Sequence, residues 1–329
     1  MDPKRSVIPK RAACPNPKFQ LQTRENRGDI PLSIENKTEG EAMATTYNNL
    51  FLDTRARLRK AGIEAGQLEA RELICYAADK SREQFYRDMA LYASDPVEEK
   101  LAELLERRLA GEPVAYLIGE WEFYGLGLDI TPDVLIPRMD TEVLAERAIL
   151  LARAAGEGAR VLDLCAGSGC VGLAVAANVP GCRVVLADVS EAALRLCKQN
   201  VRRNELNARV TCVQADALEP PDAALWDFDV IACNPPYIPT GDIAGLDVSV
   251  RDYEPRSTLD GGADGLDFYR AIAARWGAAL RLGGALLFEV GIGQAGDVGA
   301  ILAQNQFEQI QTFQDTQGIG RVVEGVLNS

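Results

Sequence analysis

Apolar runs and helical patterns alternate along the second half of the chain, and this alternation constrains the fold more than any other feature. After a helical pattern near residues 141–155, strand-like apolar runs are separated by helical stretches; the runs cover 161–164, 184–188, 210–214, 230–233 and 285–290. Strands that alternate with helices build a parallel sheet with helices on both faces. The sequence therefore predicts a doubly wound α/β domain over residues 141–329, with ligands at the carboxyl ends of its strands.

The residues before this domain divide into three segments. Residues 1–42 contain prolines and scattered charges without a sustained period, which predicts a disordered extension. Apolar residues at three- and four-residue spacings predict a small helical bundle over 43–112, and we assign it to substrate recognition because it holds no clustered chemistry. Alternating aromatic residues and glycines over 113–140 predict a β-hairpin linker.

The chain has 329 residues and no histidine, and this absence restricts its chemistry. Without imidazole there is no histidine-activated nucleophile, no imidazole metal ligand and no usual general base near neutral pH. The eight cysteines show no paired spacing, so we expect neither a zinc site nor a disulfide, and no other metal. Any reaction must depend on geometry, amides, carboxylates and a cofactor.

The overall charge favours some partners over others. A formal net charge of -13 opposes tight non-specific binding to a phosphate backbone, so a protein or small-molecule substrate is favoured over naked nucleic acid. No stretch approaches the roughly 20 apolar residues of a membrane span, and the start lacks the apolar core of a signal peptide. We therefore expect a cytoplasmic protein that does not bind membranes.

A glycine-rich turn follows the first predicted strand of the α/β domain. It comprises Cys165, Ala166, Gly167, Ser168 and Gly169. Glycines there let the backbone approach a ligand beside a helix N-terminus. With Gly172 the run also matches the dinucleotide fingerprint, so a nicotinamide enzyme and a plain tight turn both remain open. Asp188, at the next strand end, can accept hydrogen bonds from ribose hydroxyls or can cap the following helix.

The next two strand ends carry a carboxylate and an Asn-Pro-Pro-Tyr run. Asp216 can accept from an exocyclic adenine amine, or it is simply a turn carboxylate. The Asn-Pro-Pro-Tyr run consists of Asn234, Pro235, Pro236 and Tyr237. Its two prolines hold the asparagine extended and leave the Pro235 carbonyl free, which predicts a rigid pocket for a planar group. Four consecutive strand ends thus carry, in order, a glycine-rich turn, two aspartates and the Asn-Pro-Pro-Tyr run. This ordered series is more specific evidence of function than any one of its members.

This series resembles the amino-methyltransferases that use S-adenosylmethionine, and more narrowly the peptide chain release factor glutamine N5-methyltransferases of the HemK or PrmC type. The resemblance covers about 45–328, including 111–113, 134–142, 253–255 and 264–269. It implies a Rossmann-like, S-adenosylmethionine-dependent protein methyltransferase with a helical N-terminal domain. The implied reaction, in translation termination, transfers a methyl group to the side-chain amide nitrogen of glutamine in the Gly-Gly-Gln motif of class I release factors.

The resemblance also implies residue roles. The run from Cys165 to Gly169 would hold the methionine part of the cofactor, Asp188 its ribose, and Asp216 with Ala217 the adenine region. The position of Ala217 is often aromatic in the family, so this chain departs there.

The run from Asn234 to Tyr237 would hold the substrate glutamine, with Asn234 also bordering the cofactor. Asn234, Pro235 and Tyr237 are the predicted catalytic residues: the Asn234 side chain and the Pro235 carbonyl orient the amide, and Tyr237 packs against it.

Alternative functions stay open from the residues alone. A nucleic-acid N-methyltransferase places a flipped base in the same kind of pocket, and a different protein's glutamine is another possible substrate. A non-catalytic nucleotide-binding module and a nicotinamide dehydrogenase are further alternatives, although the latter leaves Asn-Pro-Pro-Tyr unexplained. Two charged pairs also have open roles. Arg138 with Glu142 either positions the substrate or forms a surface ion pair, and Glu254 with Arg256 either closes over the site or pairs internally.

Overall fold

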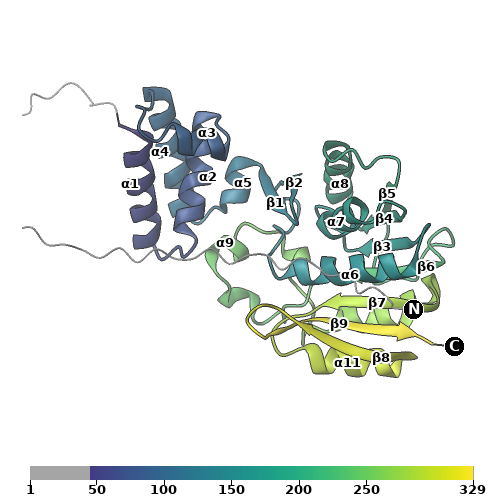
Figure 1. Ribbon diagram of the computed structural model, residues 1–329. Coiled ribbons are helices and arrows are strands. Elements are labelled where there is room, and N and C mark those ends of the chain that lie inside the picture. The colour runs from purple at the N-terminus through teal and green to yellow at the C-terminus, as the bar shows by residue number, and fades with distance from the viewer. Residues whose placement is uncertain (1–44, 329) are drawn as a thin grey trace, which may run out of the picture. The chain divides into compact units, whose positions relative to one another are not determined.

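The computed structural model describes residues 45–328, so the extension predicted over residues 1–42 lies outside the described range. The first helices form a bundle with a hydrophobic core of its own, built around side chains such as Leu58, Leu73 and Leu105 (Figure 1). These helices are α1 (Tyr47–Lys60), α2 (Gly66–Ala78), α3 (Arg82–Arg87), α4 (Asp95–Leu109) and α5 (Val114–Ile118). Their apolar side chains recur at helical spacing and face one another, as the sequence pattern predicts.

A two-stranded antiparallel hairpin follows the bundle and consists of β1 (Glu120–Phe123) and β2 (Leu126–Asp129). The hairpin is shorter than the segment in which we predicted it, because α5 occupies the start of that segment. Gly119, with a φ of 75°, ends α5 in the left-handed region that glycine adopts without strain. The division of the chain into domains at 43, 113 and 141 stays a prediction.

The α/β domain contains a seven-stranded sheet with the order β5-β4-β3-β6-β7-β9-β8. Its strands are β3 (Arg160–Leu164), β4 (Arg183–Asp188), β5 (Val210–Gln214), β6 (Phe228–Cys233), β7 (Leu280–Glu289), β8 (Phe307–Gln314) and β9 (Gly320–Leu327). The first five run parallel, and β9 pairs antiparallel with both β7 and β8. The fold class is confirmed, but β8 and β9 were not predicted. Most side chains of β8 are exposed, so its sequence lacks the apolar run of a buried strand.

Helices cover both faces of the sheet (Figure 1). One face packs against α6 (Thr141–Ala155), α7 (Cys170–Asn178) and α8 (Glu191–Arg203), and the other packs against α10 (Asp267–Arg275) and α11 (Ala295–Gln304). Successive strand residues alternate between the two cores: Val230 faces the first and Ile231 the second. This two-sided burial is why β6 reads as an unbroken apolar run.

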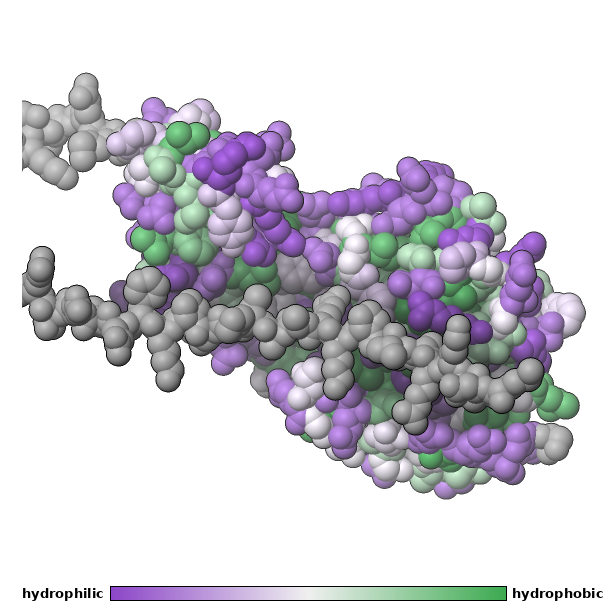
Figure 2. Space-filling model, in the orientation of Figure 1, coloured by the Kyte–Doolittle hydropathy of each residue, from purple (hydrophilic) through white to green (hydrophobic). Residues whose placement is uncertain are grey.

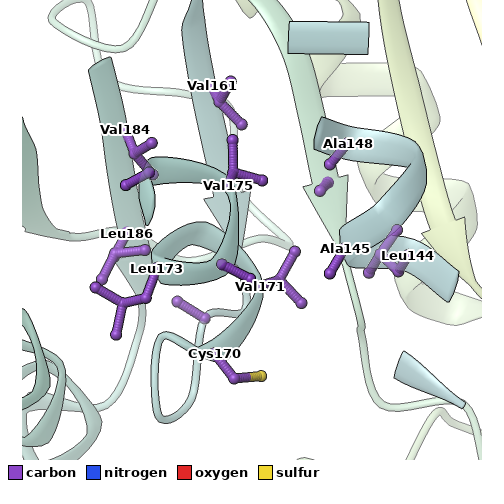
Figure 3. Packing of buried hydrophobic residues seen from close by; sticks show 14 of the residues in the cluster. Leu144, Ala145, Ala148, Val161, Cys170, Val171, Leu173, Val175, Val184 and Leu186 are labelled. Atoms are coloured by element: carbon purple, nitrogen blue, oxygen red, sulfur yellow. The ribbon is translucent and has the colours of Figure 1, made fainter. Parts of the chain in front are cut away.

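Helix α7 packs closely because it places small and branched side chains between two elements. Figure 3 shows Val171 beside Ala145 of α6, and Leu173 beside Leu186 of β4. Gly172 lies in the same turn, and a Cβ atom there would come within 2.3 Å of a Leu186 methyl group. The glycine therefore sets how near the start of α7 lies to the sheet.

The surface differs from these cores in composition. Figure 2 shows mostly hydrophilic residues on the visible face, with hydrophobic ones in small scattered groups. Scattered exposed apolar residues are normal on a folded protein surface. None of the helices within residues 45–328 has the length and apolar character needed to cross a membrane.

The strand order reverses between β3 and β6. β3 pairs with β4 on one side and with β6 on the other, so the loops after β3 and β6 diverge. A crevice at the carboxyl ends of such strands is the usual ligand site of open α/β sheets. Leu164 and Cys233 are register partners, which makes the glycine-rich turn and Asn234 immediate neighbours.

Candidate active site

A cavity of about 260 Å³ lies at this reversal point, at the carboxyl edge of the sheet. Most of the predicted site residues line it, namely Cys165, Ala166, Gly167, Ser168, Asp188, Asp216, Ala217, Asn234 and Pro236. Gly169, Pro235 and Tyr237 are not among its lining residues. Residues that the sequence analysis did not select also line it, among them Leu135, Thr141, Asp163, Val189, Leu218, Thr258 and Phe268.

The glycine-rich turn adopts left-handed backbone conformations at three positions. The φ angles of Cys165, Gly167 and Gly169 are 61°, 54° and 82°. Glycine occupies this region freely, whereas Cys165 is strained there, and such strain persists only where the surroundings enforce it. Gly169 is also packed tightly, since an added Cβ would lie 2.9 Å from a methyl group of Leu186.

Asp188 fixes the turn from the end of β4. Its Oδ2 atom accepts a hydrogen bond of 2.8 Å from the Gly167 backbone N–H, and its Oδ1 atom accepts one of 2.9 Å from Ser190. Burial raises the pKa of this carboxyl, and the backbone donors partly offset the effect. The carboxylate is therefore held in place at the cavity wall, with lone pairs left for a ligand.

Asp163 lies beneath the same turn and is almost fully buried. It accepts a 2.7 Å hydrogen bond from the Gly172 backbone N–H at the start of α7. Its pKa is raised to about 8, mainly by burial; the bond from Gly172 opposes the increase and the nearby Asp188 adds to it. This carboxyl joins the turn to the first residues of the helix.

Asn200 connects the turn to the hairpin, and the sequence analysis did not identify it. Its side-chain Nδ2 donates to the Ser168 carbonyl at 3.0 Å and to the Asp129 carbonyl at 3.1 Å. Its Oδ1 accepts from the Asp129 N–H at 2.7 Å. The side chain of Asn200 is fully buried, so these bonds are shielded from water. An asparagine within an amphipathic helix gives no sequence signal for such a role.

The third strand end contributes Asp216 and Ala217. Asp216 is exposed, and its Oδ1 accepts a 2.8 Å hydrogen bond from the Leu218 N–H. Ala217 is buried, and its carbonyl accepts a 3.0 Å bond from Nε1 of Trp276. The apolar lining comes instead from Val189, Leu218 and Phe268. Phe268 thus supplies an aromatic ring to the cavity from α10, a helix far along the chain.

Asn234 lies next to the turn, at the end of β6. It is half-buried, and its Nδ2 lies 3.5 Å from Oγ1 of Thr141, the first residue of α6. Pro235 and Pro236 are buried, and no donor within residues 45–328 bonds the Pro235 carbonyl. Burial raises the pKa of the neighbouring Tyr237 hydroxyl, so this group stays neutral.

Glycines and an amide support the Asn-Pro-Pro-Tyr backbone from the next loop. Nε2 of Gln294 donates to the Tyr237 carbonyl at 2.9 Å, and Gly261 donates to the Ile238 carbonyl at 2.9 Å. A Cβ at Gly261 would lie 2.7 Å from Cα of Tyr237, and one at Gly265 would lie 2.3 Å from the Tyr237 carbonyl oxygen. Only glycine fits such close backbone approaches.

The charged residues near this run pair differently from the predicted scheme. Arg138 forms an ion pair with Glu254, whose side chain is 1% exposed, rather than with Glu142. Glu142 accepts a 3.2 Å bond from the Tyr124 N–H, and Arg256 pairs with Asp260 at 3.2 Å. Of the two roles left open for Glu254 and Arg256, the pairing with each other is therefore not found among the described residues. The sequence carries no sign of the pairing that is found, since Arg138 and Glu254 are 116 residues apart.

Glu289 is a further buried carboxyl, at the end of β7. It is 3% exposed, and its Oε2 has no hydrogen-bond partner within residues 45–328. Burial raises its pKa to about 7, and a hydrogen bond with Thr141 opposes the increase. The sequence analysis did not select Glu289 because one acidic residue after an apolar run looks like a strand end.

Two domain families match different parts of the chain. The PrmC N-terminal domain matches residues 49–119, and the methyltransferase small domain matches residues 127–246. The boundary between the two matches falls within the hairpin segment.

Two curated proteins, both named release factor glutamine methyltransferase, are similar over most of their length. The Geobacter sulfurreducens protein is 42% identical over 274 residues, covering 83% of this chain and 93% of the relative. The Thermodesulfovibrio yellowstonii protein is 36% identical over 256 residues, covering 78% of this chain and 90% of the relative.

Among solved structures, the hMettl16 catalytic domain in complex with an RNA hairpin of the MAT2A 3'UTR aligns with a TM-score of 0.52. It is 16% identical, covering 69% of this chain and 83% of that chain, and this likeness concerns the fold alone.

Proposed function

Because the chain belongs to the release factor glutamine methyltransferase family, we propose that it methylates the side-chain amide nitrogen, N5, of the glutamine in the Gly-Gly-Gln motif of class I release factors. The methyl donor is S-adenosylmethionine. One observation supports this cavity as the site of the proposed reaction: Asn234 and the glycine-rich turn line the same space from neighbouring strand ends. A planar amide and a nucleoside ligand can therefore meet there.

The residues of the cavity fit a nucleoside donor. The turn from Cys165 to Gly169 brings backbone close to the space, Asp188 is a fixed acceptor for ribose hydroxyls, and Asp216 keeps one carboxylate oxygen free of the Leu218 bond. Val189, Leu218 and Phe268 offer apolar surface for a purine. When bound, S-adenosylmethionine supplies an electrophilic methyl group on its sulfonium sulfur.

The protein's part in the reaction is to orient the substrate amide. An amide nitrogen is a poor nucleophile because its lone pair is delocalised, so position matters more than activation by a base. Oδ1 of Asn234 and the Pro235 carbonyl are acceptors for the two N–H groups of a glutamine amide. The two prolines keep these acceptors at a fixed separation. Tyr237 packs beside them and excludes water.

The proton that leaves the substrate needs no histidine in this scheme. Methylation makes the amide nitrogen strongly acidic, so the proton is lost after transfer, to water at the mouth of the cavity. Well-oriented reacting groups reach effective molarities of roughly 10⁵–10⁸ M, so orientation alone can account for much of the rate.

We assign recognition of the release factor in part to the helical bundle over residues 43–112. The end of α4 contacts the loop that follows Asn-Pro-Pro-Tyr: the Tyr253 hydroxyl lies 3.5 Å from the Ala110 carbonyl, and a Cβ at Gly111 would lie 2.7 Å from a Val248 methyl group. This contact supports a surface that continues from the bundle to the mouth of the cavity. We also propose a cytoplasmic enzyme, because its release factor substrate acts where translation terminates.

The direct test incubates the protein with S-adenosylmethionine labelled in its methyl group and a class I release factor. We expect label in the wild-type release factor and none when the Gly-Gly-Gln glutamine is replaced by alanine. Label that persists in the replaced substrate would overturn the assignment of the acceptor. A gel-shift arm with RNA and DNA tests the expected lack of tight nucleic-acid binding, which follows from the net charge of -13.

A further inference from the structure

Glu289 ends β7 and Asn234 directly follows β6, the adjacent strand. The buried carboxyl of Glu289 therefore lies beside the site. Cys233 of β6 and Phe288 of β7 are register partners, so the residues that follow them lie side by side. Glu289 is 3% exposed, and its Oε2 atom has no hydrogen-bond partner within residues 45–328. Leaving a carboxyl oxygen buried and unpaired is costly, so this group calls for an explanation.

Thr141 connects the two side chains. It is 1% exposed and begins α6, a helix from the opposite end of the domain's sequence. Its hydroxyl is close enough to the Glu289 carboxyl to lower the pKa of that group, and its Oγ1 lies 3.5 Å from Nδ2 of Asn234. Because three separate elements supply the three side chains, their meeting is a property of the fold and not of local sequence.

The chemistry of the three groups determines the direction of each hydrogen bond. An ionised carboxylate can only accept, and a hydroxyl has a single hydrogen to donate. Thr141 must therefore donate to Glu289 and accept from Asn234, which directs Nδ2 of Asn234 toward Thr141. The other end of the amide, Oδ1, is then the end that is left to meet the substrate.

We propose that Glu289 and Thr141 are positioning residues that fix the amide of Asn234 with its oxygen available to the substrate. The inference rests on the function proposed for this site. We call the chain of hydrogen bonds from Glu289 through Thr141 to Asn234 the relay. Without the relay, the Asn234 amide can rotate by half a turn and present Nδ2, a donor, to a substrate amide N–H that needs an acceptor. The rotated form would repel the substrate nitrogen.

The groups around Glu289 decide when it is ionised. Asp140 raises its pKa, whereas Arg138 and Arg321 lower it, and the net result with burial is a pKa of about 7. Arg321 is itself paired with Asp140 at 2.8 Å and with Asp315 at 2.9 Å, and Arg138 is paired with Glu254.

Two tyrosines and a thiol also belong to these surroundings, the thiol being that of Cys170 at the start of α7, whose pKa burial raises and Glu289 raises further. The Tyr269 hydroxyl donates to the Glu289 carbonyl at 2.9 Å, and the Tyr237 hydroxyl is also near. Below about pH 7 a protonated Glu289 can donate its own proton, and the fixed direction of the relay is lost.

The first experiment compares Thr141→Val with Thr141→Ser in the full chain. We expect Thr141→Val to lower kcat by about tenfold, the effect of one lost hydrogen bond to a charged or polar partner, with the KM for S-adenosylmethionine unchanged. Thr141→Ser keeps the hydroxyl and should recover most of the lost rate. Equal rates for Thr141→Val and Thr141→Ser would show that the hydroxyl is not used.

The second experiment uses pH. In the wild type kcat should fall as pH drops through about 7, the pKa of Glu289, and Glu289→Gln should be slow at every pH with this limb absent. A role confined to stability would lower the melting temperature of Glu289→Gln and leave the shape of the pH profile unchanged. A wild-type profile that is flat from about pH 6 to 8.5 overturns the inference.

A third measurement needs no turnover and so separates this inference from the proposed function. The side-chain NH₂ signals of Asn234 in ¹⁵N NMR, identified by their loss in Asn234→Asp, should titrate near pH 7 in the wild type and not in Glu289→Gln. If the release factor is not methylated but this titration is seen, only the substrate assignment fails. If methylation occurs and the Asn234 signals ignore Glu289, the relay is wrong.

Discussion

The two walls of the cavity hold their ligand groups by different means. The loop wall, comprising residues 165–169 and Asp188, relies on backbone conformation and on bonds between residues about 20 apart. The amide wall, comprising Thr141, Asn234 and Pro236, relies on side chains that arrive from distant elements and on buried carboxyls behind them. Both walls stand at the same reversal of strand order.

This difference predicts which wall tolerates amino-acid substitutions. Only a substitution to proline removes a backbone donor, so damage to the loop wall comes mainly through added bulk or through loss of Asp188. The amide wall depends on the direction of one side-chain amide, so a single truncation removes its function. Rate should therefore respond most to the amide wall, and affinity and stability most to the loop wall.

The largest effect should follow Asn234→Ala. We expect kcat to fall by at least about 100-fold, because the main acceptor for the substrate amide is lost, while the dissociation constant of S-adenosylmethionine changes little. Single-turnover methylation and calorimetric titration measure the two quantities. Asn305→Ala is the control, since the only side-chain bond of that asparagine within residues 45–328 goes to the Ile301 carbonyl of α11. Near-normal turnover in Asn234→Ala would break the assignment of the amide wall.

Asp188→Asn should act on affinity instead. It weakens acceptance from the Gly167 N–H and from ribose hydroxyls, and hydrogen bonds to charged groups contribute roughly 1.5–3 kcal/mol each. We expect the dissociation constant of S-adenosylmethionine to rise by about 10- to 100-fold, with kcat at saturation within about threefold of wild type. Asp222→Asn, in a surface turn where Asp222 accepts from Ala224, is the matched control. A variant with lowered kcat and normal affinity would contradict the division between the walls.

Gly172→Ala should lower stability by about 1–3 kcal/mol, because the new methyl group overlaps Leu186, Val184 and Asp163. Gly296→Ala is the comparison within a helix, since no atom lies within 4 Å of its Cβ position, and it should be neutral or stabilising by up to about 1 kcal/mol. Urea unfolding of both proteins at one pH measures the difference. Equal stabilities would show that α7 can shift away from the sheet at little cost.

The last expected effect is a pH dependence of stability from Asp163. Its folded-state pKa of about 8 lies above the ordinary value of 3.8, so unfolding releases a proton between these limits. The free energy of unfolding should therefore decline as pH rises from about 4 to 8. Asp163→Asn keeps an acceptor for Gly172 and removes this contribution, so its stability relative to wild type should improve with pH. Parallel unfolding curves at pH 5, 6.5 and 8 would exclude the effect.

The loop wall could be predicted from the sequence because its determinants are local. A glycine-rich turn after an apolar run, an aspartate at the next strand end and the order of these signals all follow from short segments. The alternation of strands and helices likewise predicted the parallel part of the sheet. β8 was not predicted because most of its side chains are exposed and carry no such pattern, and β9 was not predicted because Glu324 and Gly325 interrupt its short apolar run.

The amide wall could be predicted only at Asn234 and the residues that directly follow it. Three further residues contact or adjoin the Asn-Pro-Pro-Tyr run, namely Thr141, Glu289 and Gln294. They come from positions up to 153 residues apart, and a single sequence does not show that such distant positions are close in space. The pairing of Arg138 with Glu254 was missed for the same reason. Phe268 supplies an aromatic ring from another helix to the cavity that Ala217 also lines, and the residues around position 217 give no signal of this.

The hydrogen bonds of Asn200 determine where a chimera of two such enzymes can be joined. An amide whose oxygen and nitrogen bond the backbone of both Asp129 and Ser168 cannot turn without breaking several buried bonds. The hairpin is thus anchored to the glycine-rich turn more firmly than its place in the chain suggests. A chimera that takes its first helices from a relative should be joined at Gly119, where the backbone is open, and should keep its own hairpin.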